Sequence, residues 1–322
     1  MPQPLTATTI QVGGDIGAAI ASFKRTLAQE NKSPATVRAY VGAAEGLARF
    51  LDEKRMPTTL TTITREHVEE YIIALQRRWK DTSVAARFQA LQAFFKWAVD
   101  REEVHDSPMA RMKRPKVREA VPAMLREDEV RAILRVCEKD KSFEGKRDAA
   151  IVRIFLDTGC RRSEVANLRF NPKDPHNNDV GLDQRQLRIW GKGGIERFVR
   201  IGDKTTDALD KYVSARASHT YASSERLWLT SHSRGRDAGR LTESGLAQVV
   251  LKRGEEAGIK GAHAHQFRHW YAHSWLAAGG TEGGLMAQCG WKSRRMLQRY
   301  GAALATERSH AEHDRLRPGD RL

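Results

Sequence analysis

The stretch QLRIWGKGGIERFVRI, residues 186–201, decides the fold class because its pattern differs from that of the segments around it. Residues 186–190 and 196–201 are short and strand-like, and the turn between them carries Gly191, Gly193 and Gly194. Two such runs joined by a glycine-rich turn predict a β-hairpin. Elsewhere the apolar residues recur mostly at helical spacing. We therefore predict a mainly α-helical fold with a small β-sheet.

A helical domain is predicted upstream of the hairpin. Ser33 followed by Pro34 is typical of a helix start, since serine caps the helix and proline fits its first position. Thr64 and Asp81 precede two further segments with helical periodicity. Residues 1–14 are polar and rich in threonine and glycine, which predicts a disordered lead.

A second domain follows an exposed linker. Residues 113–124 combine Pro115 and Pro122 with dense charge and no periodicity, which is typical of a linker. Helical patterns resume at Leu125, and one apolar helix ends at Gly159, a residue suited to a C-cap. The predicted organisation is a lead at 1–14, a helical domain at 15–112, a basic linker at 113–124, a second domain at 125–305 and a charged, helix-like tail at 306–322.

The composition favours a nucleic-acid partner. The 322 residues carry a formal net charge of +15, spread along the whole chain, and a globular chain this basic usually meets a polyanion. Its three cysteines form no CxxC pair or disulfide framework, which fits a reducing compartment. No signal-peptide pattern is evident, and no apolar run approaches the ~20 residues that span a bilayer. We expect a cytoplasmic protein without a membrane partner.

Basic residues in the helical domain and in the linker are candidate contacts to a DNA backbone. The alternative is that these charges lie on solvated helix faces, and for any single residue it explains the charge as well as DNA contact does. The candidates are Arg77, Arg78, Lys80, Arg87, Lys113, Arg114 and Lys116.

Arg161, two residues after Gly159, is predicted to begin a new helix. Its guanidinium binds phosphate oxygens bidentately, and a helix N-terminus adds N–H donors. Glu164 lies three residues on, hence on the same face, where it could orient a neighbour. Arg162 is a further candidate phosphate contact. A surface ion pair of Arg161 with Glu164, worth little energy, is the alternative interpretation.

Four more residues suggest chemistry. Lys192 occupies the glycine-flanked hairpin tip, where it could enter a site, although an ordinary turn lysine has the same pattern. His265 and Arg268 are three positions apart on one predicted helix, which pairs a proton-transfer group with a second guanidinium. Tyr300 is a nucleophile only if it is activated, because a phenol has a pKa near ~10.

A metal site is not favoured. His269 and His273 have the spacing of a zinc-binding helix but lack the glutamate of an HExxH motif. No third ligand is evident nearby. We expect neither a metal nor another cofactor.

Taken in order, these segments resemble the tyrosine recombinases, the family of phage integrases and Xer-type recombinases. The resemblance covers about residues 15–305. Its motifs are TGCRRSE at 158–164, GKG at 191–193, HQFRH at 265–269, CGW at 289–291 where the family usually has Leu-Gly-His, and Tyr300 nine residues after Trp291.

The resemblance implies a SAM-like core-binding domain followed by a mixed α/β catalytic domain. It further implies that a tyrosine attacks DNA and forms a 3′-phosphotyrosyl link, without metal or ATP. Trp291 replaces the common histidine; its indole N–H can donate a hydrogen bond but cannot titrate. The implied catalytic residues are Arg161, Lys192, His265, Arg268, Trp291 and Tyr300, with Glu164 in support.

The implied partner is double-stranded DNA with inverted-repeat core sites, bound by a homotetramer on two sites. The implied setting is a bacterial or phage-encoded, nucleoid-associated protein. Integration or excision of a mobile element is the first interpretation of its role, and chromosome or plasmid dimer resolution is the alternative. A type IB topoisomerase, a catalytically idle DNA-binding regulator and a metal-dependent nuclease are the competing functions.

Overall fold

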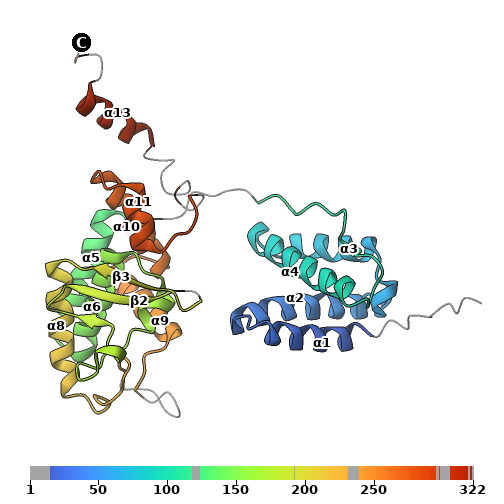
Figure 1. The fold of residues 1–322 in the computed structure, drawn as a ribbon, viewed down its shortest axis with the longest axis horizontal. Coiled ribbons are helices and arrows are strands. Elements are labelled where there is room, and N and C mark those ends of the chain that lie inside the picture. The colour runs from blue at the N-terminus through green and yellow to red at the C-terminus, as the bar shows by residue number, and fades with distance from the viewer. Residues whose placement is uncertain are drawn as a thin grey trace, which may run out of the picture. The chain divides into compact units, whose positions relative to one another are not determined.

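Four helices build the N-terminal part of the chain in the computed structural model (Figure 1). The structure describes residues 15–117, 124–191, 193–230, 239–294, 297, 305–317 and 320. The chain divides into two units, residues 1–120 and 121–322. The N-terminal unit contains α1 (Ile16–Gln29), α2 (Pro34–Glu53), the short 3-10 helix Leu60–Thr62, α3 (Arg65–Gln76) and α4 (Asp81–Asp100).

The helix starts that the sequence predicted at Pro34 and after Thr64 are confirmed and have local caps, and α4 begins at Asp81 itself. The Ser33 hydroxyl accepts a hydrogen bond from the Thr36 backbone N–H at 3.1 Å, and Pro34 is the first residue of α2. The Thr64 backbone N–H donates to Nδ1 of His67 at 3.1 Å at the start of α3. The sequence analysis did not single out α1, although Ile16 and Ile20 mark its buried face.

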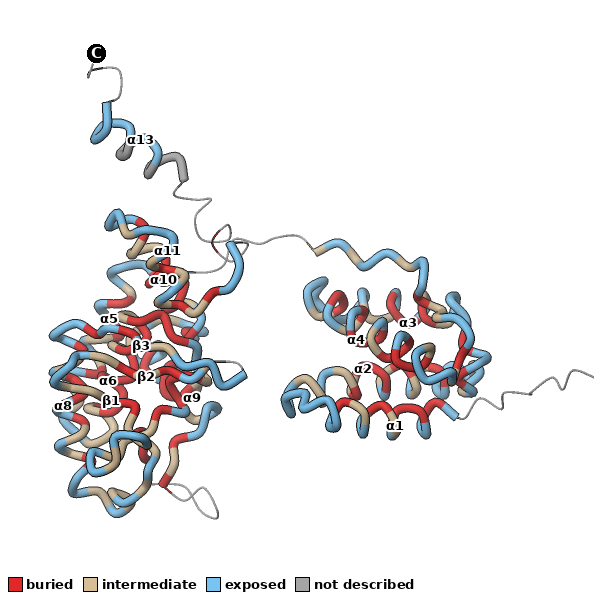
Figure 2. The backbone as a smooth tube through the Cα atoms, viewed as in Figure 1, coloured by how far each residue is buried: buried red, intermediate tan, exposed pale blue. Residues whose placement is uncertain are grey.

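The core of the N-terminal unit lies between α2 and α4. Leu47 and Leu51 of α2 are fully buried, as are Phe94 and Phe95 of α4. Figure 2 shows the buried residues on the faces that the helices turn toward one another and the exposed residues on the opposite faces. This pattern is the amphipathic periodicity expected of packed helices.

The C-terminal unit is helical around a small sheet, as predicted. No helix within the described residues of either unit is long and apolar enough to cross a membrane. The elements of this unit are α5 (Glu127–Lys139), α6 (Phe143–Thr158), α7 (Arg162–Ala166), the short 3-10 helix Pro175–Asn177, β1 (Val180–Gly181), β2 (Gln186–Trp190), β3 (Glu196–Arg200), α8 (Asp203–Ala217), α9 (Glu243–Glu256), α10 (Ala264–Ala277), α11 (Glu282–Cys289) and α13 (Ala305–Leu316).

The predicted hairpin is present as β2 and β3, and β1 extends it to a three-stranded antiparallel sheet. Leu187 lies opposite Val199, and Ile189 lies opposite Arg197. Because side chains alternate across a strand, Arg197 and Val199 share one face of β3. Leu187, Ile189 and Val199 are fully buried, so this face turns toward the core.

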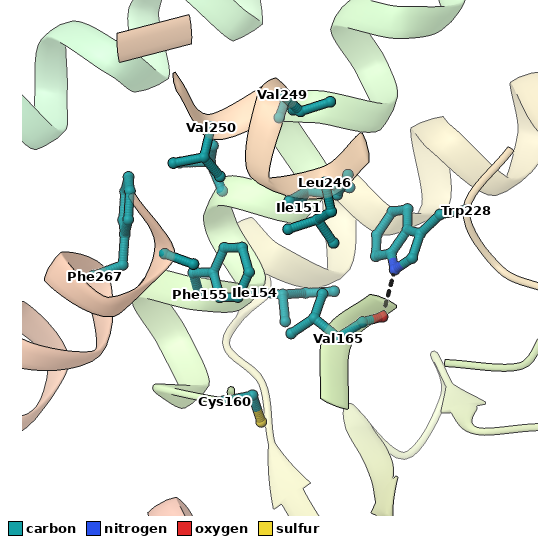
Figure 3. Packing of buried hydrophobic residues seen from close by; sticks show 14 of the residues in the cluster. Ile151, Ile154, Phe155, Cys160, Val165, Trp228, Leu246, Val249, Val250 and Phe267 are labelled. Atoms are coloured by element: carbon teal, nitrogen blue, oxygen red, sulfur yellow. Dashed lines mark hydrogen bonds between the residues drawn. The ribbon is translucent and has the colours of Figure 1, made fainter. Parts of the chain in front are cut away.

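Helix α6 is central to the C-terminal unit and contacts α5, α8, α9 and α10. Its residues Ile151 and Phe155 belong to the buried cluster drawn in Figure 3. In the same cluster, Nε1 of Trp228 donates to the carbonyl oxygen of Val165 at 2.7 Å. This bond holds the short helix α7 against the core and thereby fixes the segment that begins at Arg161.

A buried charge cluster joins α6 to α9. The Asp148 carboxylate accepts hydrogen bonds from Nε of Arg147 at 2.9 Å and from Nε of Arg253 at 2.8 Å. All three residues are buried. Arg253 also donates to Asp140, which follows the last residue of α5. Buried charges of this kind are tolerated only when they are paired.

Candidate active site

The turn between α6 and α7 places Arg161. Helix α6 ends at Gly159, whose φ of 56° lies in the left-handed region. A Cβ atom at this position would lie 2.5 Å from Cδ1 of Tyr271, so the close approach also requires glycine. Arg161 is the N-cap of α7, as the sequence predicted.

Glu164 holds Arg161 in place. The Glu164 carboxylate accepts hydrogen bonds from the backbone N–H of Arg161 at 2.8 Å and from its Nη1 at 2.9 Å. The Arg161 side chain stays 45% exposed, whereas the Glu164 side chain is 4% exposed. The alternative of a weak surface pair therefore does not describe this contact, since its carboxylate is buried. Glu164 therefore holds the backbone and one guanidinium nitrogen of Arg161 and leaves the rest of the guanidinium accessible.

A second arginine, Arg197 of β3, also binds Glu164. Its Nη1 donates to Oε1 at 3.1 Å and its Nη2 donates to Oε2 at 2.8 Å. Burial opposes ionisation of the Glu164 carboxyl, and the bonds from Arg197 and Arg161 outweigh that effect and lower its pKa. Glu164 is therefore a carboxylate at neutral pH.

Arg197 was not among the site residues predicted from the sequence. A signal for it existed, because Arg197 takes the core-facing side of a strand whose neighbour Val199 on that side is buried. A charged residue on such a face requires a buried partner. The partner, Glu164, is 33 positions away in the sequence.

Arg268 of α10 is buried and fixed by main-chain oxygens. It is 2% exposed. Its Nη2 donates to the carbonyl oxygen of Cys289 at 2.8 Å, and its Nη1 donates to the carbonyl oxygen of Gly159. Arg268 thus joins the end of α6 to the end of α11.

Trp291 lies against Arg268. The guanidinium carbon of Arg268 is 5.1 Å from the centroid of the indole ring, within the range of a cation–π contact. Trp291 is 5% exposed and belongs to a second apolar cluster with Tyr271, Leu276 and Leu285. Gly290 precedes it with a φ of 61° and ends α11. The tryptophan is therefore anchored by α10 and α11.

A cleft of about 800 Å³ is lined by residues of the segments that carry Arg161, Arg197 and Trp291. Arg161 and Trp291 line it, together with the hairpin glycines Gly191 and Gly193. The cleft is thus bounded by the segment that begins at Arg161, by the hairpin residues Gly191 and Gly193, and by the segment after α11. A concave site with convergent polar groups is the usual form of an active site.

Of the remaining predicted catalytic residues, the structure describes His265 alone. His265 is exposed on α10, and its ring centroid is 4.5 Å from that of His269. Lys192 and Tyr300 lie outside the described residues. Among the described residues, no group of three or more His, Cys, Asp or Glu side chains is arranged to hold a metal ion.

The candidate DNA contacts occupy two kinds of environment. Arg77, Arg78 and Lys80 are exposed between α3 and α4, and Lys113, Arg114 and Lys116 are exposed after α4. Arg87 is half-buried; its Nη1 donates to the Gly42 carbonyl oxygen at 3.2 Å, and its guanidinium lies 4.1 Å from the Trp79 ring centroid. Arg162 donates to Glu243 of α9. Arg87 thus packs within the N-terminal unit, whereas Arg162 forms an exposed ion pair with Glu243.

Comparison with known proteins assigns the family. Residues 123–307 match the model of the phage integrase family, and residues 20–102 match the phage integrase N-terminal SAM-like domain. The chain belongs to the phage integrase family. The resemblance to tyrosine recombinases is thereby confirmed, together with the SAM-like and catalytic domains that it implied.

Relatives and solved structures agree with the family assignment. The tyrosine recombinase XerC of Roseiflexus castenholzii (strain DSM 13941 / HLO8) is 30% identical over 91% of this chain and 91% of the relative. XerC of Syntrophus aciditrophicus (strain SB) is 27% identical over 90% of this chain and 94% of the relative. These relatives support the activity of a site-specific recombinase for this integrase-family chain.

The fold is shared with two proteins of known structure. XerH bound to palindromic difH substrate, in a post-cleavage complex, has a TM-score of 0.73 at 14% identity and covers 97% of this chain and 99% of that chain. A lambda integrase dimer bound to a COC′ core site has a TM-score of 0.70 at 15% identity. The match covers 93% of this chain and 81% of that chain.

Proposed function

We propose that this integrase-family chain cleaves and rejoins DNA at specific sites through a covalent bond between Tyr300 and a 3′ phosphate. The observation that carries the proposal is the grouping of Arg161 and Trp291 in one cleft, with Arg268 stacked on Trp291. Two guanidinium groups and an indole N–H would then meet one scissile phosphate.

The proposed reaction is a phosphoryl transfer. The Tyr300 hydroxyl oxygen attacks phosphorus, and the bond between phosphorus and the 5′ oxygen breaks. His265 accepts the tyrosine proton, and Lys192 gives a proton to the leaving 5′ oxygen. The phosphotyrosyl bond keeps the energy of the phosphodiester, so a free 5′ hydroxyl of a partner strand reverses the step without ATP.

The supporting residues act on the phosphate-binding groups. Glu164 keeps Arg161 in position through the bonds described above. Arg268 has five N–H donors in a planar fork, and its bonds to the Gly159 and Cys289 carbonyls fix the plane of that fork. Rigid donors of this kind stabilise charge that develops in the transition state.

The proposed partner is duplex DNA with inverted-repeat core sites, bound by a homotetramer on two sites. Exposed cations on the N-terminal unit and after α4 support backbone binding: Arg77, Arg78, Lys80, Lys113, Arg114 and Lys116. Such contacts give affinity that falls with salt.

Two biological roles share this chemistry. The first role is integration or excision of a mobile element. The Xer names of full-length relatives fit the alternative, chromosome or plasmid dimer resolution. DNA recovered with the Tyr300→Phe protein and sequenced distinguishes them, because the ends of a mobile element support the first role and a site in the chromosome or plasmid outside any element supports the second.

The Tyr300→Phe variant also tests the chemistry. A duplex with the recovered sequence, nicked near the cleavage point, traps a covalent adduct because the short cleaved strand diffuses away. We expect an adduct with the native chain and none with Tyr300→Phe, while both bind the duplex with similar affinity. An adduct with the variant, detected by denaturing gel, would refute Tyr300 as the nucleophile.

A further inference from the structure

Arg197 links three segments of the candidate active site, and nothing in the proposed reaction yet uses it. Besides its two bonds to Glu164, Nε donates to the carbonyl oxygen of Gln288 at 3.1 Å and Nη2 donates to Sγ of Cys160 at 3.6 Å. A Cβ atom on Gly290 would lie 3.1 Å from the Arg197 guanidinium carbon. The guanidinium therefore lies against the segment that leads into Trp291.

The sheet explains why Arg197 reaches this place. Arg197 lies opposite Ile189, two residues before the buried Val199 and directly after the hairpin turn. The pleat turns its side chain inward, toward α7 and the end of α11. The strand that carries the Lys192 turn is thus tied to both other walls of the cleft.

Arg197 is unsuited to bind a phosphate itself. Four hydrogen bonds use four of its five N–H groups. Both arginines line the cleft, but the Arg161 side chain is 45% exposed and accessible to a phosphate, whereas the hydrogen bonds of Arg197 hold its guanidinium against protein groups. Arg197 acts through its neighbours.

We propose, on the basis of the function proposed above, that Arg197 is a positioning residue for DNA cleavage. It holds Glu164 and the end of α11 in one arrangement, so that Arg161 and Trp291 meet the same phosphate. A bidentate bond to a carboxylate fixes both distance and orientation, which a single hydrogen bond does not.

The charge balance around Glu164 provides a measurable consequence. Arg161 and Arg197 contact the carboxylate, and Arg268 and the thiols of Cys160 and Cys289 lie in the same cluster. Burial raises the pKa of both thiols, to about 11 for Cys289, so they stay neutral near pH 7. Without Arg197, burial of Glu164 is opposed only by the bonds from Arg161, and the Glu164 pKa rises.

The experiment compares single-turnover adduct formation by full-length variants between pH 5.5 and 9 on the nicked duplex. Arg197→Met is expected to be at least ~10-fold slower than the native chain at pH 6.5 and to recover as pH rises, because Glu164 must be ionised. Glu164→Gln should lack this additional pH dependence. The double variant should lose less than the product of the two single losses, since the two residues share the Arg197–Glu164 contact.

Arg197→Lys keeps the charge but not the planar fork. It is expected to fold, to cleave ~3- to 10-fold more slowly than the native chain and to keep the native pH profile. A native rate for Arg197→Lys, an equal loss for Arg197→Met at every pH, or multiplied losses in the double variant would overturn the positioning role. Absence of an adduct with the native chain would instead overturn the proposed function, and the role of Arg197 with it.

Discussion

At the scale of single residues, Gly159 sets the position of Arg161 in two ways. Its φ of 56° costs residues other than glycine about 1–2 kcal/mol, and a Cβ would overlap the Tyr271 ring at 2.5 Å. Overpacking of this kind costs about 1–3 kcal/mol. We expect Gly159→Ala to lower the free energy of unfolding by about 2–4 kcal/mol, measured by chemical denaturation with tryptophan fluorescence.

Gly258 provides the matched control for this prediction. Its φ is 80°, but a Cβ there would meet no atom within 4 Å. Gly258→Ala should therefore lose only the backbone contribution of about 1–2 kcal/mol. Equal losses in the free energy of unfolding for the two variants would show that the overlap with Tyr271 adds no destabilisation.

The residues of the site were predictable where their partners are close in the sequence. Arg161 and Glu164 are three positions apart, and helical spacing alone predicted that they share a face. Arg197 was not predictable in this way, because its contact with Glu164 depends on the register of β2 against β3 and on the place of α7. The catalytic roles of Lys192, His265 and Tyr300 remain predictions.

At the scale of elements, the buried carboxylate of Asp148 joins α6 to α9. It accepts bonds from Arg147 and Arg253, and all three side chains are at most 7% exposed. Asp148→Asn would leave two buried guanidinium groups without their shared negative charge. Breaking a buried pair in this way costs about 3–5 kcal/mol, and we expect that loss in the free energy of unfolding measured by urea titration.

An exposed ion pair in the same unit serves as the control. Glu127 and Arg131 of α5 have side chains that are 69% and 71% exposed. Glu127→Gln should change the free energy of unfolding by less than about 1 kcal/mol, because solvent screens the pair. A comparably small change in the free energy of unfolding for Asp148→Asn would mean that the two guanidinium groups do not depend on the Asp148 charge.

Elements with local signals were predictable, and elements defined by tertiary contacts were not. The start of α2 and the hairpin follow from Ser33, Pro34 and the glycine turn. The start of α7 at Arg161 was predicted, but the helix has five residues, too few for a periodic pattern that would predict where it packs. Its position depends on the bond from Trp228 to Val165, which joins residues 63 positions apart.

At the scale of the whole molecule, the two-unit organisation follows from separate cores. One apolar cluster runs from Ile16 to Met109, and the clusters of the second unit begin at Leu125. No buried residue of these clusters falls between Met109 and Leu125 within the described chain. A charged segment with two prolines cannot supply apolar burial, and this is why its composition predicted a boundary.

We predict that the C-terminal tail contributes to assembly rather than to folding of one chain. Helix α13 has 12 residues, a length that is marginal for an isolated helix in water. Its residue Leu316 is 43% exposed. The apolar clusters of the described C-terminal unit end at Leu297, so removal of residues 306–322 takes no residue from them. The helix thus has an apolar residue available to a neighbouring subunit.

Deletion of residues 306–322 tests this role. The segment contains four arginines and four acidic residues, so its removal leaves the net charge and the long-range attraction to DNA nearly unchanged. We expect the melting temperature and the affinity for a single site to stay close to native, and the complex that joins two sites to weaken by at least ~10-fold. Leu316→Asp in the full chain should weaken the two-site complex in the same direction. Gel-shift titrations with one-site and two-site DNA measure both quantities, and an equal loss on the two substrates would place the tail in DNA binding instead of subunit contact.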